Sequence, residues 1–155
     1  MKYFGGCDAG STYTKCVIID ENGKMVAHVT LKSKINAVES ARIGLEEAIK
    51  QVPDLHDAKD LTYLIGTGYG RNKVPFADEN ISEISCHAMG VHIADPSITS
   101  IIDIGGQDIK GIAIDPKDGT VQNFAMNDKC IFSIMRYCQT ALKSFYSGRI
   151  KMVED

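Results

Sequence analysis

The chain has 155 residues, of which 44% are hydrophobic, and a formal net charge of −3 at pH 7. This length suits about one domain with a good core. Acidic and basic residues are interspersed, so we expect neither a nucleic-acid nor a membrane partner, and no apolar run approaches the ~20 residues of a transmembrane helix. Five cysteines without regular spacing do not indicate a disulfide framework. We therefore expect a cytoplasmic protein.

The first feature is a predicted hairpin, in which a β-rich run ends at Asp8 and a second one begins after a turn of small residues. Gly10 lets the backbone approach a ligand closely, and Ser11 and Thr12 can donate short hydrogen bonds to an anion. The turn is therefore typical of a phosphate cradle. An ordinary Gly/Ser hairpin with an exposed acid fits the same residues.

The remaining elements follow in a regular order. After strands over 2–7 and 14–20, the sequence predicts a third strand over 25–31, a helix over about 37–52 that Pro53 ends, a buried parallel strand over 61–65 and a second helix over 82–94. The same order then begins again with strands over 100–105, 108–114 and 120–126 and a helix from about Ile131 to Tyr146.

An internal repeat connects the two hairpins. The polar positions agree in pairs, since Asp8 matches Asp103, Gly10 matches Gly105 and Lys15 matches Lys110. Two facing phosphate loops, each with a carboxylate, are what a nucleotide-hydrolysing cleft needs, because amides hold the phosphates while the acids organise Mg²⁺ and its waters.

Other polar residues leave alternatives open. Arg71, after a glycine-rich loop, can reach a phosphate or an acid, or lie on the surface. Glu83 and His87 share one helix face, which fits a metal pair, a proton relay, a solvated pair, or an orienting role for Glu83. Cys7 and Cys16 are expected to be small buried hydrophobes.

Five motifs, in this order across residues 1–130, resemble the activator ATPases of 2-hydroxyacyl-CoA dehydratases, in the BadF/BadG/BcrA/BcrD group of the actin-like superfamily. They are Asp8-Ala9-Gly10-Ser11-Thr12 with Thr14-Lys15, Gly66-Thr67-Gly68-Tyr69-Gly70-Arg71, Glu83-Ile84-Ser85-Cys86-His87-Ala88, Ile102-Asp103-Ile104-Gly105-Gly106-Gln107-Asp108 and Met126-Asn127-Asp128-Lys129-Cys130. The resemblance implies a ribonuclease H-like (actin-like ATPase) α/β fold. We expect a βββαβα lobe over residues 1–97 and the first half of a second lobe over 98–155.

The resemblance also implies a homodimer with one [4Fe–4S] cluster at the subunit interface. Such an activator would receive electrons from a donor such as ferredoxin or flavodoxin, bind ATP or ADP, and transfer one electron to the dehydratase component. By position, Cys130 is one of the two cluster ligands of each subunit. A cysteine at the start of a helix also suits this role, because the helix dipole favours the thiolate.

Two departures from the family pattern concern the C-terminal part. The segment after Cys130 is bulky, where the family has small residues, and the chain ends before the part that carries the second cluster cysteine and most of the adenine and ribose pocket. Cys138 is not an obvious substitute, since eight positions along a helix span about 12 Å. We therefore expect a truncated or rearranged activator, or one that another chain completes.

The predicted roles follow from these motifs. Asp8 and Asp103 would organise Mg²⁺-bound water, and Gln107 would orient the attacking water. The phosphates would be held by Ser11, Thr12, Lys15, Gly105 and Gly106. Two alternatives are a nucleotide-binding or scaffold domain without turnover, and a small-molecule kinase of the same superfamily, for which no base or acceptor pocket can be named.

Overall fold

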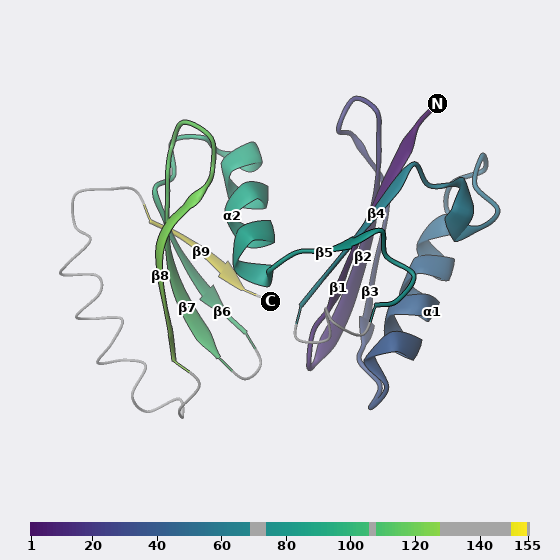
Figure 1. The fold of residues 1–155 in the computed structure, drawn as a ribbon, viewed down its shortest axis with the longest axis horizontal. Helices are drawn as coiled ribbons and strands as arrows, with labels where there is room; N and C mark the ends of the chain where they lie inside the picture. Colours follow the sequence, from purple (N-terminus) through teal and green to yellow (C-terminus); the bar gives the residue numbers. More distant parts are fainter. Residues whose placement is uncertain (69–73, 106–107, 128–149, 155) are drawn as a thin grey trace. The chain divides into compact units, whose positions relative to one another are not determined.

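The computed structural model describes residues 1–68, 74–105, 108–127 and 150–154. Contacts between Cα atoms divide the chain into two compact units, Met1–Glu83 and Ile84–Asp155, each with its own sheet (Figure 1). Within the part of the chain that the structure describes, no helix is both long and apolar enough to cross a membrane.

The first unit is a mixed sheet covered by one long helix. Its elements are β1 (Tyr3–Ala9), β2 (Tyr13–Asp20), β3 (Met25–Lys32), α1 (Ala37–Ile49), the short 3₁₀ helix η1 (Ala58–Asp60), β4 (Tyr63–Thr67) and β5 (Glu79–Asn80). The strand order is β3-β2-β1-β4-β5; β1 and β2 are antiparallel, and β4 runs parallel to β1. The three-stranded meander and the parallel fourth strand are as the sequence predicts.

Helix α1 begins and ends for local reasons. The side chain of Asn36 accepts hydrogen bonds from the N–H groups of Val38 and Glu39, which caps the first turn. The apolar stripe of Ala41, Leu45 and Ala48 is buried against the sheet. The helix ends at Ile49, earlier than the expected residue 52, because residues 51 and 52 donate to carbonyls three positions back and tighten the chain into turns before Pro53.

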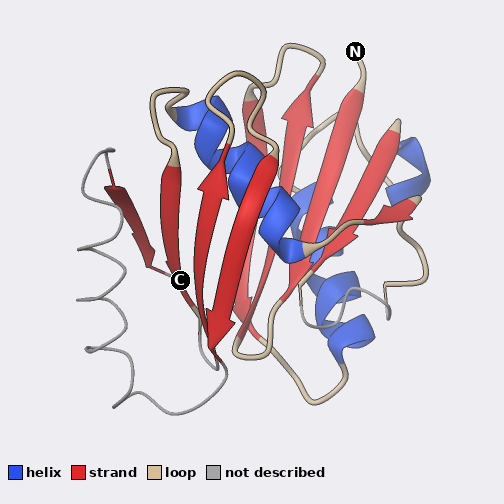
Figure 2. Cartoon of the chain, turned by 60° about the vertical axis from the view of Figure 1, so that its left-hand side comes forward, coloured by secondary structure: helices blue, strands red, loops and turns tan. Residues whose placement is uncertain are grey.

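The second unit has a four-stranded sheet with one helix against it. Its elements are α2 (Glu83–Ala94), whose first residue is grouped with the first unit, β6 (Ser100–Ile104), β7 (Ile109–Ile114), β8 (Val121–Asn127) and β9 (Ile150–Glu154). The strand order is β8-β7-β6-β9. Ala88 of α2 packs in one core with Ile101, Ile112 and Ile114 of the sheet, and Figure 2 shows the helices of both units against layers of strands.

The register of the strands confirms the internal repeat. Asp8 is directly opposite Lys15 across β1 and β2, and Asp103 is directly opposite Lys110 across β6 and β7. The irregularities of the two meanders also coincide, since one register shift lies between Ile18 and Ile19 and the other between Ala113 and Ile114. In each meander the register shift lies just before an aspartate, so the irregularity occurs at the same place in both.

The turns after the second strands repeat as well. Asp20 receives hydrogen bonds at Oδ1 from the N–H groups of Asn22 and Lys24, and Asp115 receives one at Oδ1 from Lys117 N–H. A glycine closes each turn with a positive φ, 77° at Gly23 and 73° at Gly119.

Three expectations about larger features stay predictions. The helix expected from Ile131 to Tyr146 lies outside the described residues. The division into lobes over 1–97 and 98–155, and the facing of the two hairpins across a cleft, also remain expectations. Strands β5 and β9 are not foreseen by the sequence pattern; β5 has only the residues Glu79–Asn80, too few for a recognisable alternation.

Candidate functional site

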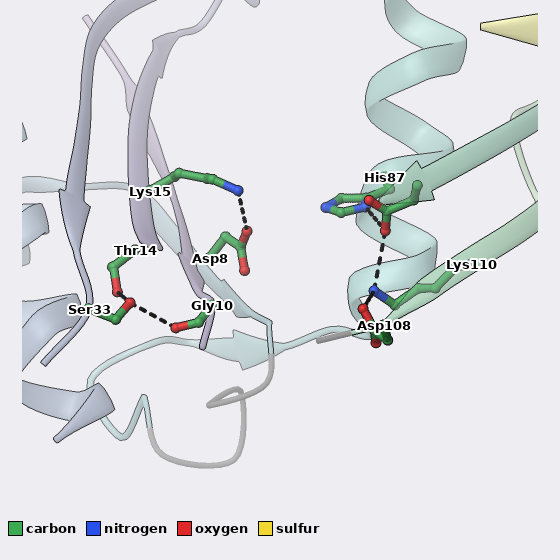
Figure 3. Close-up of polar contacts among 9 residues, drawn as sticks. Asp8, Gly10, Thr14, Lys15, Ser33, His87, Asp108 and Lys110 are labelled. Atoms are coloured by element: carbon green, nitrogen blue, oxygen red, sulfur yellow. Dashed lines mark hydrogen bonds and ion pairs between the residues drawn. The ribbon is translucent and has the colours of Figure 1, made fainter. Parts of the chain in front are cut away.

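The first hairpin carries an acid and a base at its tip. Asp8 lies near the end of β1, and Lys15 lies opposite it on β2, with 3.8 Å between Nζ and Oδ2 (Figure 3). Both side chains are partly exposed, Lys15 by 28% and Asp8 by 17%. The contact is long and both side chains reach solvent, so a phosphate oxygen can approach the lysine ammonium.

The turn between these two residues is braced by Ser33. Its Oγ donates to the carbonyl of Gly10 at 2.8 Å and lies 2.9 Å from Oγ1 of Thr14, and its N–H donates to the carbonyl of Thr12 at 2.9 Å. Figure 3 shows the chain of contacts from Thr14 through Ser33 to Gly10. Ser11 and Thr12 are exposed. The carbonyl groups of Gly10 and Thr12 are thus hydrogen-bonded to Ser33, while the side chains of Ser11 and Thr12 remain exposed to solvent.

Two glycines in the first unit are required by close approach. A Cβ on Gly10 would overlap the carbonyl oxygen of Tyr13, so the turn itself demands a glycine there. Gly68, after β4, has a φ of 91°, and a Cβ there would overlap Oδ1 of Asp8. The glycine-rich loop after β4 therefore passes directly against the Asp8 carboxylate, as far as the structure describes it.

The second hairpin holds its charges far more tightly. Nζ of Lys110 lies 3.3 Å from Oδ2 of Asp103 and 2.9 Å from Oδ1 of Asp108. The Asp103 side chain is 1% exposed and the Lys110 side chain is 3% exposed. Asp103 and Lys110 therefore form a pair with almost no contact with water, where charge pairing is strong, while the Asp108 side chain is 28% exposed.

Helix α2 adds a second partner to Asp103. Nδ1 of His87 lies 2.9 Å from Oδ2 of Asp103, and because a carboxylate accepts, the imidazole is the donor. Burial opposes the ionised form of Asp103, yet the pKa of this carboxyl is lowered, because the hydrogen bond from His87 and the charges of His87 and Lys110 together outweigh burial. Asp103 is thus a buried carboxylate that stays ionised at neutral pH.

The other oxygen of Asp103 has a different environment. Oδ1 is buried, and no described residue forms a hydrogen bond with it. A buried carboxylate oxygen without a partner is costly. It fits a site for a donor from outside the chain, and the water shell of Mg²⁺ supplies such donors.

Glu83 lies close to His87 and Asp103. One ligand atom from each of Glu83, His87 and Asp103 lies within 4.8 Å of the other two. The set has the donor types for a divalent cation, but the Lys110 ammonium already neutralises Asp103. The metal-pair and proton-relay interpretations of Glu83 and His87 therefore remain alternatives, and His87 contacts Asp103.

The first sheet contains two cysteines that are buried, as the sequence predicts. Cys7 and Cys16 are directly opposite on β1 and β2, are 1% and 0% exposed, and have their sulfur atoms 3.0 Å apart. The hydrogen bond with Cys7, followed by burial, raises the pKa of the Cys16 thiol. Both cysteines are therefore buried core residues, as predicted.

The remaining predicted site residues divide into two groups. Gly105 uses its N–H to close the second turn on the carbonyl of Asp108 at 2.9 Å, and its contact with phosphate stays a prediction. Those that lie outside the described residues are Arg71, Gly106, Gln107 and Cys130. Sequence reasoning missed Ser33, and it included Asp108 in a motif without assigning it a role.

Comparison with known proteins agrees with this geometry. A family model described as the BadF/BadG/BcrA/BcrD ATPase family matches residues 6–145. The (R)-2-hydroxyglutaryl-CoA dehydratase activating ATPase of Acidaminococcus fermentans is 41% identical over 138 residues, which are 87% of this chain and 50% of that protein. The activator of lactoyl-CoA dehydratase of Anaerotignum propionicum is 36% identical over 154 residues, 98% of this chain and 57% of that protein.

A solved structure shows the same fold. The activator of the 2-hydroxyisocaproyl-CoA dehydratase from Clostridium difficile, with bound ADPNP, superposes with a TM-score of 0.76 at 37% identity and covers 93% of this chain and 52% of that chain. The chain therefore spans about half the length of the relatives that it matches.

Proposed function

Because the chain belongs to the BadF/BadG/BcrA/BcrD ATPase family, we propose that it acts, alone or as part of a longer protein, as an ATP-dependent activator of a 2-hydroxyacyl-CoA dehydratase. The names of its relatives in Acidaminococcus fermentans and Anaerotignum propionicum support this activity. The observation that carries the proposal is the duplicated Asp–Lys hairpin, Asp8 with Lys15 and Asp103 with Lys110. Paired elements of this kind suit a polyphosphate and its counterion.

In this proposal the chain binds a nucleotide together with Mg²⁺, which neutralises phosphate charge when bound. Asp103 would accept hydrogen bonds at Oδ1 from the Mg²⁺ water shell, since this oxygen is buried and has no partner among the described residues. Asp8 would do the same in the first hairpin. Lys15 would turn to a phosphate, because its contact with Asp8, at 3.8 Å, is long.

The phosphates would also contact the turns of the two hairpins. Ser11 and Thr12, exposed at the first turn, would donate to phosphate oxygens, and Gly106 would do so at the second. Gly105, whose N–H is bonded to the carbonyl of Asp108, would contribute by letting the backbone come close to the phosphate. Gln107 would orient the attacking water. A nucleotide of this kind is consistent with the ADPNP in the related activator from Clostridium difficile.

The electron-transfer part of the proposal rests on the family resemblance. Cys130, which follows Asn127-Asp128-Lys129, would be one ligand of a [4Fe–4S] cluster shared by a homodimer. A thiolate-bound cluster supplies one-electron chemistry when present. Ferredoxin or flavodoxin would be the electron donor, and the dehydratase component the acceptor. No buried thiol of the first sheet competes for this role, because Cys7 and Cys16 are paired with each other.

A second candidate is a nucleotide-binding domain of the same fold without turnover. The observation that favours it is the length of the match, since relatives are about twice as long as the matched segment. This candidate predicts Mg²⁺-dependent nucleotide binding with negligible phosphate release and no iron. A visible iron–sulfur absorbance after anaerobic purification would separate the two.

The direct test combines the anaerobically purified chain with ATP, Mg²⁺, a reductant and a 2-hydroxyacyl-CoA dehydratase, and measures phosphate release and enoyl-CoA formation. We expect activity that requires ATP and that falls about 100-fold or more in Asp103→Asn. Asp115→Asn, the same chemical change in the turn that follows β7, is the matched control. An Asp103→Asn protein that hydrolyses ATP as fast as the parent would contradict the assigned roles.

A further inference from the structure

We infer that His87 is a positioning residue for the Mg²⁺–nucleotide complex, because it holds one oxygen of Asp103 so that the other is left for the ligand. The inference rests on the proposed function and deepens it. His87 acts through Asp103; it is not placed in contact with the nucleotide. The ligand class is a nucleoside polyphosphate bound with Mg²⁺.

The contacts of Asp103 are divided between its two oxygens. Oδ2 is 2.9 Å from Nδ1 of His87 and 3.3 Å from Nζ of Lys110, while Oδ1 is buried without a partner among the described residues. Both donors thus converge on one oxygen. This arrangement leaves the other oxygen for an external donor.

Lys110 alone would not fix the carboxylate. Its ammonium also binds Oδ1 of Asp108, at the shorter distance of 2.9 Å, and an ammonium on a flexible stem can pair with either oxygen of Asp103. With the lysine contact alone, the Asp103 carboxylate could turn about its Cβ–Cγ bond and move its second oxygen. A second donor with a fixed direction holds the plane of the carboxylate, and with it the position of that oxygen.

His87 supplies such a donor. Its ring is only 23% exposed, and the neighbouring Ala88 is fully buried in the core that joins α2 to β6 and β7. The helix is thus anchored on the sheet one residue away from the imidazole. A planar ring on an anchored helix directs Nδ1–H at Oδ2, which is the geometry expected of a positioning group.

The atom that makes the contact allows a sharp test. Asparagine carries its amide nitrogen at about the place of Nδ1, whereas glutamine carries it one bond farther, at about the place of Nε2. His87→Asn should therefore keep the hydrogen bond to Asp103, and His87→Gln and His87→Ala should lose it. Each variant is compared by its binding of ADP with Mg²⁺ and with EDTA, after the folded fraction has been measured.

The expected result is Mg²⁺-dependent affinity about tenfold weaker than the parent in His87→Ala and His87→Gln, and near that of the parent in His87→Asn; tenfold is about 1.4 kcal/mol. The affinity for ADP in EDTA should be alike in all four proteins, because a positioned carboxylate serves the Mg²⁺ shell. A merely structural role would lower both affinities together.

The possible results distinguish a failure of the proposed function from a failure of the positioning role of His87. Absence of Mg–ADP binding by the parent would overturn the proposed function and this inference with it. If the parent binds, parent-like affinity of His87→Ala would overturn only the positioning role. Equal affinities of the asparagine and glutamine variants, whether strong or weak, would do the same, because the Nδ1 contact would then not be what matters.

Discussion

Lys110 lies directly opposite Asp103 across the β6–β7 hairpin, and its ammonium is 3.3 Å from the carboxylate in a site that is almost closed to water. The equivalent pair of the first hairpin, Asp8 and Lys15, has the same register but a distance of 3.8 Å and greater exposure. The two hairpins thus share a strand register but differ in the burial of their charged pairs. In the second hairpin the aspartate and the lysine are almost fully buried, so each charge needs the other to offset its loss of water.

Loss of the Lys110 charge should therefore destabilise the fold. Lys110→Met would leave the buried Asp103 with His87 as its one side-chain partner among the described residues, and breaking a buried pair on one side costs about 3–5 kcal/mol. Urea denaturation of the variant measures this loss. The double variant Lys110→Met/Asp103→Asn should recover part of it, because the uncompensated carboxylate is then gone.

Lys15→Met provides the matched control in the first hairpin. Because its pair with Asp8 is long and partly exposed, we expect a loss of no more than about 1 kcal/mol. Equal losses for the two lysine variants would show that burial does not distinguish the hairpins.

We expect the contacts of the Ser33 hydroxyl with the first turn to contribute more to nucleotide binding than to the stability of the fold. Ser33→Ala removes the hydroxyl that contacts Gly10 and Thr14, so the turn would have to be ordered by the ligand. We expect Mg–ADP binding to weaken by about 1 kcal/mol, the net value of a typical hydrogen bond.

Ser40→Ala is the comparison for this brace. Ser40 is buried at the start of α1 and bonds Lys34 N–H and the Asn36 carbonyl, so its hydroxyl serves the helix entry. Its loss should lower stability and leave the affinity for Mg–ADP unchanged. If Ser40→Ala weakens binding as much as Ser33→Ala, the brace is not specific to the turn.

The turn after β2 should give a pH-dependent contribution to stability. Hydrogen bonds from the N–H groups of Lys24 and Asn22 lower the pKa of Asp20. Because the pKa is lowered by folding, this stabilisation is present above the unfolded-state value of about 3.9 and is lost as the pH falls through the folded-state pKa. We expect Asp20→Asn to be less stable than the parent at pH 7, with a gap that closes below about pH 4. Urea midpoints across this range measure the gap, and a gap of constant size would exclude the carboxylate charge as its cause.

Much of the fold could be predicted because the sequence repeats itself. The match of Asp8 with Asp103 and of Lys15 with Lys110 predicted two equivalent hairpins, and the structure has each aspartate directly opposite its lysine. The length of α1 was overestimated, because the apolar period continues to Val52 while the backbone has already tightened into turns.

The electrostatics of the site could not be read from sequence spacing. His87 lies 16 positions before Asp103 and was paired in the prediction with Glu83, its neighbour on the helix. Only the packing of Ala88 on the second sheet brings the imidazole to the carboxylate. Ser33 was missed for a similar reason, since a serine after a strand carries no signal until the chain returns it to the Gly10 turn.

Calorimetric titration of the anaerobically purified chain with Mg–ADP tests most directly whether the residues of the two Asp–Lys hairpins bind a nucleotide with Mg²⁺, as we propose. We expect saturable binding at micromolar affinity, about −8 kcal/mol, which weakens at least about tenfold in Asp103→Asn. Absence of binding at millimolar Mg–ADP, or an affinity that Asp103→Asn does not change, would contradict it.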